Sequence, residues 1–501
     1  MKKLFSRILA VSLAALILIA MLVSCGGGKG NDKADAAVTT AGEAGDTAET
    51  GTTRIEPDLP EKDFGGYKFN VLTKGTSNVH WKSKDIFAAE LNGEIINDSV
   101  FERNSKIGEK YNFSITEQIT SQGTWNMHSD VSKMVLAGED TIDMSAGGLT
   151  GDLRTLSSGG MLIDLKTVPY MDLTQPYYDQ NCNAQISINN HLYATTGDLI
   201  VMDNEATIAI IYSKKMAEDN QLGDFYEDID KGSWTTDRML ECATVVSADL
   251  NGDGIHDEFD AWGVIGEVFN TLVYIYGTGE RIIEKDKEDL PTLALENERF
   301  YTAFEKSIAI NGNFDICLYA SNYTKYTDVW TDCIDKAFAE DRALFNTAGL
   351  VRVTVFRGKD TDFGILPLPK LDEKQTEYYS PVSVGCSNSI TIPATASDLD
   401  RTGIIIEALS CESMYTLTPA YYEITVKGKA IRDEKSAEVL DMIFANRVYD
   451  LGYMYDWGSI ASKIMGLTGS TSPNIASTIA STVGAAETKM QETIDQYLAL
   501  D

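Results

Sequence analysis

The chain has 501 residues, and its 42 Lys and Arg against 75 Asp and Glu give a formal net charge of −33. Phosphate backbones require a basic face, so this charge argues against nucleic acid as a partner. The hydrophobic content of 43% is that of an ordinary globular protein, and a chain of this length usually divides into two or more domains. Four scattered His and seven Cys without a C-x-x-C pair argue against a zinc ribbon and a His-based triad.

Residues 1–24 are predicted to be a targeting segment. A basic start, Lys2 to Arg7, precedes an apolar run from Ile8 to Val23, which is short for a membrane-spanning helix and typical of a secretion signal. The run ends in Leu22-Val23-Ser24-Cys25, which resembles the bacterial lipobox, where the Cys sulfur carries a lipid after cleavage. We therefore expect lipidation at Cys25. The alternative is a plain signal peptide or an N-terminal membrane helix.

Residues 25–63 follow as a predicted disordered acidic linker. The stretch 26–63 contains no aromatic residue and is rich in Gly, Ala, Thr, Asp and Glu. Such a sequence buries too little apolar area to offset the entropy of ordering. We expect it to tether a folded body to the extracellular face of a bacterial membrane.

The next stretch of the chain predicts alternating strands and helices. Strands are expected at 67–72, 113–119 and 142–144, and helices at 95–111 and 131–136. This order predicts an α/β fold with a mostly parallel sheet covered by helices on both faces.

Two loops of this region are candidate ligand-binding segments. Ligands of parallel α/β sheets bind beyond the carboxyl ends of the strands, which here are followed by Thr73–Lys82 and Ser145–Arg154. Trp81 lies on the first loop, and Asp152 and Arg154 lie on the second. These three residues are candidate ligand contacts, although a Trp can equally belong to the core and the loop charges can simply be solvated.

A second α/β region is predicted downstream. Its expected elements are strands at 205–212, 343–356, 363–366 and 389–393, and helices at 214–220, from 236, at 300–310, at 402–417 and from 434. The Ser/Thr/Gly-rich stretch 468–483 predicts no defined element. The six Cys after Cys25 are widely spaced, and either disulfides or buried thiols would fit them.

The clearest motif with chemistry begins at Asp249 and reads DLNGDGIHDE. Alternating oxygen side chains with Gly at the sixth position are typical of loops that wrap Ca²⁺. The EF-hand expects Glu at position twelve, where this chain has Asp260. We predict a structural calcium site rather than a catalytic one, and the alternative is a solvated turn without an ion. The predicted ligands are Asp249, Asn251, Asp253, the Ile255 carbonyl, Asp257 and Glu258.

Residues 64 to 460 resemble the extracellular solute-binding proteins of ABC importers, especially the large sugar-binding group. The resemblance rests on the order of several segments. They are the lipobox with its acidic tether, Trp234-Thr235-Thr236 before a helix, DLNGDGIHDEFDAWG, DFGILPLPK from Asp362, AYYE from Ala420, and RVYDLG from Arg447.

The resemblance implies a two-lobe periplasmic-binding-protein-like fold with hinge strands and a central cleft. The first lobe would comprise 64–200 plus 378–413, and the second 205–370 plus 414–501. By the same resemblance, Glu205 lies at a hinge position and Trp457 at a place where stacking aromatics occur, so both join the candidate ligand contacts.

The implied function is capture of a small solute, most often a mono- or oligosaccharide, by a monomeric, non-enzymatic protein that delivers it to a membrane permease. Aromatic rings stack on the C–H faces of sugars, and polar side chains pair with their hydroxyls. Two other functions remain open. One is a surface glycoside hydrolase with paired carboxylates, and the other is a calcium-dependent adhesion protein.

Overall fold

The computed structural model describes residues 54–78, 80–359, 361–426 and 434–500, and the part from Ile55 onward forms one compact unit. The predicted signal peptide 1–24 and the predicted lipidation site Cys25 lie outside the described residues. Across the described ranges, none of the helices combines the length and apolar character that a membrane crossing requires.

The first lobe is built on a four-stranded sheet with the order β12-β3-β1-β2. Strand β1 pairs in parallel with both β2 and β3, whereas β12 runs antiparallel to β3. Their bounds are β1 (Tyr67–Thr73), β2 (Phe113–Ile119), β3 (Met144–Gly147) and β12 (Ser389–Thr391).

Helix α2 covers this sheet with an apolar stripe. Helix α2 buries Ile96, Val100 and Ile107 at helical spacing, and α14 and α15 pack on it. The helices of the first lobe are α2 (Ile95–Tyr111), α3 (His128–Ala137), α4 (Leu149–Gly151), the π-helix η1 (Asp152–Ser157), η2 (Leu165–Thr167), α5 (Gln180–Ile186), α14 (Leu399–Tyr415) and α15 (Leu417–Val426).

The second lobe is built on a five-stranded sheet with the order β10-β4-β9-β5-β8. Strands β5, β8 and β9 are parallel to one another, and β4 runs antiparallel to β9 and β10. Every residue of β4, β5 and β10 is buried, as expected for strands covered on both faces. Their bounds are β4 (Ile208–Ser213), β5 (Trp262–Gly266), β8 (Cys317–Tyr319), β9 (Ala343–Gly349) and β10 (Phe363–Leu366).

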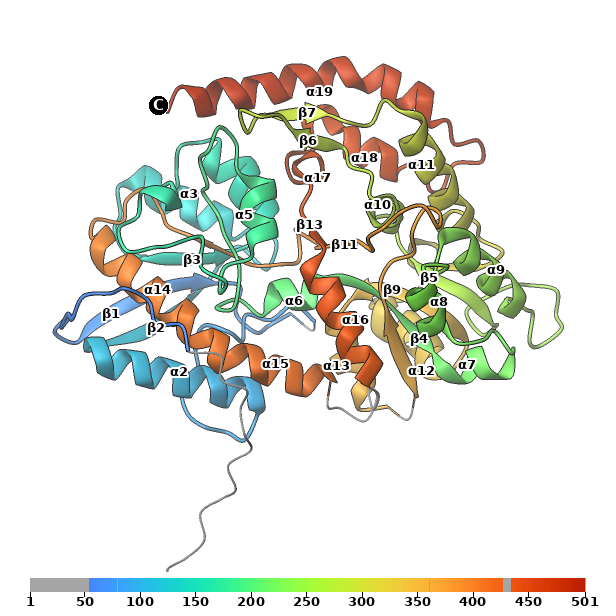
Figure 1. The fold of residues 1–501 in the computed structure, drawn as a ribbon, viewed down its shortest axis with the longest axis horizontal. Coiled ribbons are helices and arrows are strands. Elements are labelled where there is room, and N and C mark those ends of the chain that lie inside the picture. The colour runs from blue at the N-terminus through green and yellow to red at the C-terminus, as the bar shows by residue number, and fades with distance from the viewer. Residues whose placement is uncertain (1–53, 79, 360, 427–433, 501) are drawn as a thin grey trace, which may run out of the picture. The chain divides into compact units, whose positions relative to one another are not determined.

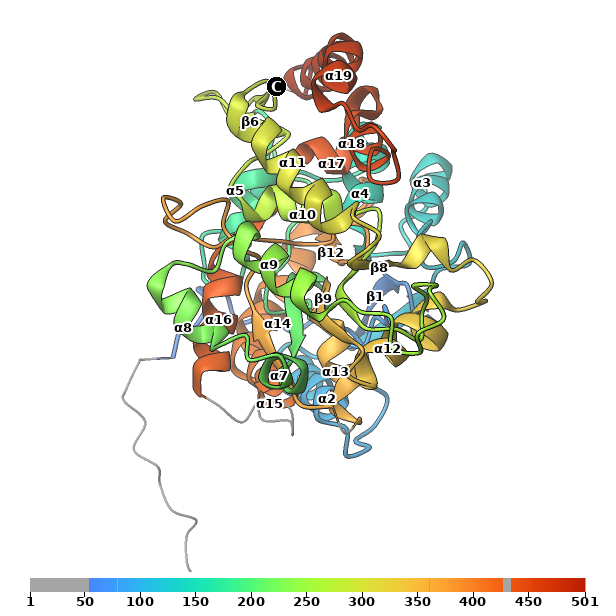
Figure 2. The same ribbon diagram turned by 90° about the vertical axis from the view of Figure 1, so that its right-hand side faces the viewer.

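Figures 1 and 2 show the helices around this second sheet, where α7, α9 and α12 pack on its strands. The helices of the second lobe are α7 (Lys214–Asp219), α8 (Phe225–Lys231), α9 (Thr236–Val246), α10 (Asn270–Gly277), α11 (Glu298–Asn311), η3 (Ala320–Asn322), η4 (Trp330–Ile334), α12 (Asp335–Ala339), α13 (Val351–Arg357) and α16 (Glu434–Ala445).

Three short elements lie between the two sheets and form the hinge: α6 (Met202–Ala206), β11 (Ser380–Pro381) and β13 (Arg447–Val448) (Figure 1). Strands β11 and β13 pair in parallel, and the Ser383 amide donates to the Ala206 carbonyl at 2.8 Å. These backbone bonds tie the three elements into one unit. The arrangement confirms the predicted α/β fold with hinge strands.

The last part of the chain adds a hairpin and a helical extension to the second lobe. Helix α19 packs on η5, α18 and β7, and Tyr497 near its end donates a hydrogen bond to Ser157 of the first lobe at 3.0 Å. The elements are β6 (Ile283–Lys285), β7 (Pro291–Leu293), α17 (Leu451–Tyr455), η5 (Trp457–Ser459), α18 (Ile460–Met465) and α19 (Ile475–Leu498).

The structure differs from the sequence predictions at several places. The strand predicted at 343–356 is strand β9 followed by helix α13, and the strand predicted from Glu205 begins only after helix α6. The stretch 468–483, for which no element was predicted, contains the start of α19. Helix α15, which falls in the predicted second lobe from residue 414 onward, packs instead on α2 through Leu417 and Tyr421.

The end of the predicted linker also contacts the body. The Ile55 amide donates to the Tyr415 hydroxyl at 2.7 Å, and Leu59 packs against the core of the first lobe. Ile55 and Leu59 are apolar residues at the end of a polar stretch, which gives these positions area to bury.

Candidate functional site

The carboxyl ends of strands from both sheets lead to one region between the lobes. In the first lobe, β1 ends before Lys74 and β3 ends before Gly148, and the antiparallel β12 begins beside them. In the second lobe, β5 ends before Glu267 and β9 ends at Gly349. Ligands of α/β sheets bind at such strand ends.

Side chains from the two lobes touch at these strand ends. A methyl group placed on Gly349 would lie 3.1 Å from Cη2 of Trp81 and 2.7 Å from the Glu205 carbonyl oxygen. Because Gly349 has no side chain, the Trp81 ring can approach the end of β9 and the hinge helix α6 closely. Trp81 is partly buried there.

Glu205 takes part in a buried ion pair. Its side chain is 1% exposed and accepts a hydrogen bond from Lys84 Nζ at 2.5 Å. Burial raises the pKa of Glu205, and the Lys84 charge opposes that rise. The pair joins the loop after β1 to the hinge helix α6, so Glu205 positions the Trp81 loop.

Arg352 on α13 connects the second lobe to the first. Its Nη1 donates to Asp335 Oδ2 at 2.7 Å and lies 3.3 Å from His80 Nε2, while its guanidinium lies 4.9 Å from the centre of the Trp330 ring. Burial and the Arg352 charge lower the pKa of His80 to about 4, so His80 is neutral at pH 7 and accepts from Arg352. Of these residues, His80 and Asp335 border a groove of about 690 Å³ that also reaches Lys336.

Lys74 and Asp152 lie at the strand ends of the first lobe. Lys74 is 3% exposed, donates to the Ser387 carbonyl at 3.2 Å, and has its ammonium 5.6 Å from the centre of the Trp125 ring. Asp152 is fully buried and accepts from Ser389 Oγ at 2.6 Å. Burial lowers the pKa of Lys74 to about 8 and raises that of Asp152 to about 7.

Trp125 is the most exposed ring near these strand ends. About half of its side chain, 52%, is exposed, and it lies on the loop that follows β2. An exposed indole backed by an ammonium group is an effective platform for a C–H face or a π system.

The second lobe contributes an aromatic pair and a carboxylate. Phe269 stacks on Tyr453 with ring centres 4.8 Å apart. Burial raises the pKa of Glu267, and the nearby Arg352 charge lowers it. The pKa of Cys386 is raised to about 11 by burial and is also affected by Lys74, Glu267 and Arg352, which places charges from both lobes around this thiol.

Four of the five predicted ligand contacts lie around this region. Trp81 and the Glu205 carbonyl meet at Gly349, and Asp152 is buried beside Lys74. Arg154 is exposed; burial raises the pKa of Tyr453, and the Arg154 charge opposes that rise. Trp457 lies elsewhere. It is 5% exposed, stacks on Tyr455 at 4.6 Å, and donates through Nε1 to Thr493 of α19 at 2.9 Å, so its ring belongs to the core of the second lobe.

Sequence reasoning missed Trp125, Trp330, Lys74 and Arg352. Trp125 and Lys74 follow β2 and β1, so the rule that selected Trp81 also applies to them. Arg352 was not recognised as a site residue because its segment was predicted as part of a strand. No sequence signal distinguishes Trp330, which is placed by the packing of η4.

The predicted calcium loop is an exposed turn in which backbone amides donate hydrogen bonds to the side-chain oxygens. Asp249 accepts from the amides of Gly252 and Gly254, and both glycines have positive φ angles of 73° and 79°. Asn251, Asp253 and Asp257 each accept an amide two residues further on.

Two acidic residues of this loop differ in their partners. Glu258 pairs with Lys325 and accepts from the Tyr326 hydroxyl, whereas Asp260 is fully buried and accepts from the Leu250 and Asp257 amides. In the described part of the chain, no group of three or more His, Cys, Asp or Glu side chains is arranged to hold a metal ion. The calcium site stays a prediction.

No protein-family model and no curated protein sequence matches this chain. Solved structures do. The ABC-transporter-associated binding protein from B. animalis subsp. lactis Bl-04, in complex with β-1,6-galactobiose, aligns with a TM-score of 0.55 at 13% identity, covering 85% of this chain and 98% of that one.

Two further structures give the same result. A solute-binding protein from Thermotoga lettingae with α-D-tagatose aligns with a TM-score of 0.53 at 13% identity, over 85% of this chain and 100% of that one. The maltose/maltodextrin-binding domain MalE from Bdellovibrio bacteriovorus with maltotriose aligns with a TM-score of 0.51 at 14% identity, over 86% and 100%. The chain therefore has the two-lobe fold of the solute-binding proteins of ABC transporters.

Proposed function

We propose that the protein is the substrate-binding component of an ABC importer and that its ligand is a mono- or oligosaccharide. The observation that carries the proposal is the approach of Trp81 of the first lobe to the end of β9 of the second lobe at Gly349. Lys74 lies beside Trp125 in the first lobe, and Arg352 lies beside Trp330 in the second. The likeness to solved proteins with bound saccharides supports it.

The chemistry of the region suits a polyhydroxylated ligand. Indole rings stack on the apolar faces of a sugar, while charged and amide groups form hydrogen bonds with its hydroxyls. The thiol of Cys386 is largely protonated at pH 7 because burial raises its pKa to about 11, so it is a poor nucleophile. The indole rings and the charged and amide groups of the region are therefore assigned to ligand binding.

Closure of the lobes would follow from differential affinity. A ligand that contacts Trp125 of the first lobe and Trp330 of the second binds the closed state more tightly than the open one. In this proposal the closed, loaded protein delivers its ligand to a membrane permease.

A thermal-shift screen with mono- and oligosaccharides, followed by calorimetry of each hit and chromatography of the mixture, tests the proposal. A saccharide that binds should raise the melting temperature by mass action and be recovered intact. Cleaved products would instead indicate a glycoside hydrolase, and a panel without any hit would contradict a saccharide ligand.

The proposal also includes a lipid anchor at Cys25 and Ca²⁺ bound at the Asp249 loop. For the anchor, the expected result is that the protein is found in the membrane fraction and that Cys25→Ser moves it to the soluble fraction. A wild-type protein that is already soluble would contradict the anchor without affecting ligand binding.

A further inference from the structure

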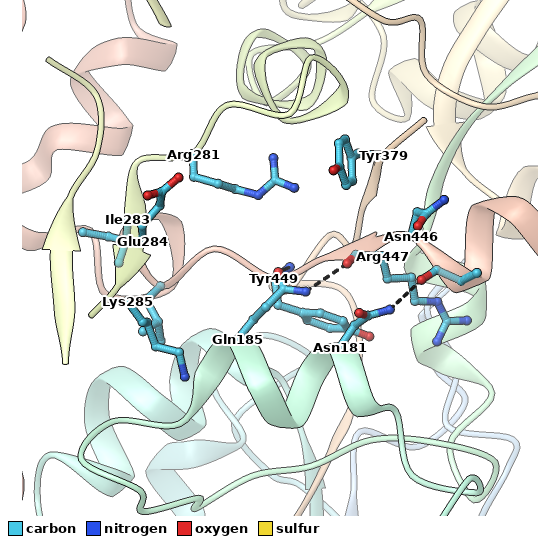
Figure 3. Close-up of a pocket in the computed structure, with 12 residues that line it drawn as sticks. Asn181, Gln185, Arg281, Ile283, Glu284, Lys285, Tyr379, Asn446, Arg447 and Tyr449 are labelled. Atoms are coloured by element: carbon cyan, nitrogen blue, oxygen red, sulfur yellow. Dashed lines mark hydrogen bonds between the residues drawn. The ribbon is translucent and has the colours of Figure 1, made fainter. Parts of the chain in front are cut away.

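A second pocket lies beside the hinge strand β13, and we call it the β13 pocket. It has a volume of about 390 Å³, within the range of small-molecule sites. Helix α5 of the first lobe forms one wall, the segment around β13 a second, and the β6 region with Tyr379 a third (Figure 3). Its lining residues are Asn181, Gln185, Arg281, Ile283, Glu284, Lys285, Tyr379, Ala445, Asn446, Arg447, Tyr449 and Leu451.

Hydrogen bonds from α5 hold two walls of the pocket together. Asn181 Nδ2 donates to the Ala445 carbonyl at 2.9 Å, and Gln185 Nε2 donates to the Arg447 carbonyl at 3.0 Å. Gln185 Oε1 also accepts from the Tyr449 amide at 2.9 Å. These bonds preorganise the pocket, so a ligand would not have to order its walls.

Arg281 is the charged group that these walls leave without an anion. Its Nη1 donates to the carbonyls of Tyr276 at 3.1 Å and Glu280 at 2.8 Å, and its guanidinium lies 5.0 Å from the centre of the Tyr379 ring. Figure 3 shows the side chain extending across the pocket toward Tyr379. Within the described ranges, Nε and Nη2 have no acceptor and no carboxylate forms an ion pair with Arg281.

The nearby acidic side chains already have partners. Glu280 pairs with Arg299 at 2.7 Å, and Asp450 accepts from the Ile282 and Gly452 amides. Burial lowers the pKa of Arg281, and the charges of Asp450 and Glu280 oppose that change without forming an ion pair with the guanidinium.

The other polar groups of the pocket either form no hydrogen bond or already have a partner. In the described part of the chain, the Asn446 side chain and the Tyr379 hydroxyl form no hydrogen bond. Lys285 is paired with Asp289 and donates to Ser187. Glu284 is the acidic residue of the lining, and it is exposed.

We propose that the β13 pocket is a second ligand site, separate from the Trp81–Trp125–Trp330 region, which binds a small hydroxylated carboxylate such as a sugar acid. The adjacent Nε and Nη2 donors of Arg281 match the two oxygens of a carboxylate. The side-chain amide of Asn446 and the side-chain oxygen of Asn181 bind the hydroxyls of the ligand. Because Lys285 is paired, the charge in this lining that would attract an anion is the Arg281 guanidinium.

Calorimetry of the full-length mature protein with D-glucuronate tests this site, and D-glucose serves as the neutral comparison because it differs in the carboxylate. We expect glucuronate to bind and glucose to leave its affinity unchanged. Arg281→Gln should weaken glucuronate at least tenfold. Arg357→Gln is the matched control, because Arg357 also donates to a backbone carbonyl but lies outside the pocket.

Two isosteric changes keep the test valid if Arg281→Gln fails to fold. Asn446→Asp adds a negative charge and should weaken glucuronate severalfold, whereas Glu284→Gln removes one and should strengthen it. Glucuronate should still bind to Trp125→Ala. The proposal is overturned if glucuronate does not bind, if none of the three pocket variants changes its affinity, or if Trp125→Ala abolishes its binding.

Discussion

At the scale of single residues, the candidate site pairs aromatic rings with buried charges. Lys74 lies beside the exposed Trp125 in the first lobe, and Arg352 lies beside Trp330 in the second. A cation over one face of an indole is attracted to the ring and helps to fix its orientation. These two pairs, together with Trp81, give the region its capacity to hold a sugar.

The first prediction concerns these rings. Trp125→Ala and Trp330→Ala should each weaken saccharide binding by about 1–3 kcal/mol, because a large ring contact is lost. Calorimetry measures the loss, and the matched variants Trp125→Phe and Trp330→Phe should retain most of the affinity. Trp457→Ala should lower stability and leave affinity largely intact, because Trp457 is a core residue. Wild-type affinity in both Ala variants would show that the ligand lies elsewhere.

A second prediction follows from the pKa of Asp152, which burial raises from 3.8 to about 7. Between these pH values the unfolded chain has lost the proton and the folded chain has kept it, so rising pH favours unfolding. Asp152→Asn removes this effect and should become more stable relative to wild type between about pH 4 and 7, by up to about 4 kcal/mol.

Urea unfolding of both proteins across this pH range measures the difference. A stability difference that stays constant with pH would show that Asp152 does not keep its proton in the folded protein. Thr73→Ser, a change of one methyl group at the adjacent strand end, is a control that should not alter the pH dependence.

Sequence reasoning reached part of the site because strand ends can be recognised in a sequence. Trp81, Asp152 and Arg154 were selected in this way. Trp457 could not be judged correctly, because its burial depends on Thr493 and on a helix that begins 18 residues later in the chain. Contacts of that kind are tertiary and leave little trace in local sequence.

At the scale of elements, segments with strong hydrophobic periodicity were predicted correctly, whereas apolar runs that fit either a strand or a helix were not. The helix 95–111 and the strand 113–119 were predicted with the observed bounds. The β-branched run after Gly349 predicted a continuing strand, yet it forms α13, in which Val353 and Phe356 pack inward at helical spacing. Tertiary packing overrides intrinsic preference in such runs.

Helix α19 is the second case. Its buried positions Ile475, Ile479 and Ala486 repeat at helical spacing, but small and hydroxylated residues between them weaken the pattern. The helix nevertheless matters, because the Tyr497 hydroxyl bonds to Ser157 and lies 2.9 Å from the Tyr455 hydroxyl. These contacts connect the end of the chain to the first lobe.

A third prediction concerns the Asp249 loop. If it binds Ca²⁺, chelation should lower the melting temperature and leave ligand specificity unchanged, since ion binding at 100 times its Kd adds about 2.7 kcal/mol. Asp249→Asn should make the melting temperature insensitive to the chelator. Equal melting temperatures of the wild type with and without chelator would contradict the calcium site.

At the scale of the whole molecule, two α/β lobes, each built on one sheet, are joined through the hinge of α6, β11 and β13. The α/β class and the two-lobe arrangement could be predicted because the order of elements and a family resemblance pointed to the same fold. The exact division of the chain between the lobes could not, since the position of α15 depends on its packing against α2.

The most direct measurement is a crystal structure of the mature protein with a saccharide that the thermal-shift screen identifies. We expect an intact saccharide between the lobes, with its rings against Trp81, Trp125 or Trp330. A saccharide bound at any place outside this region, or cleaved products within it, would show that the protein does not capture an intact saccharide between its lobes.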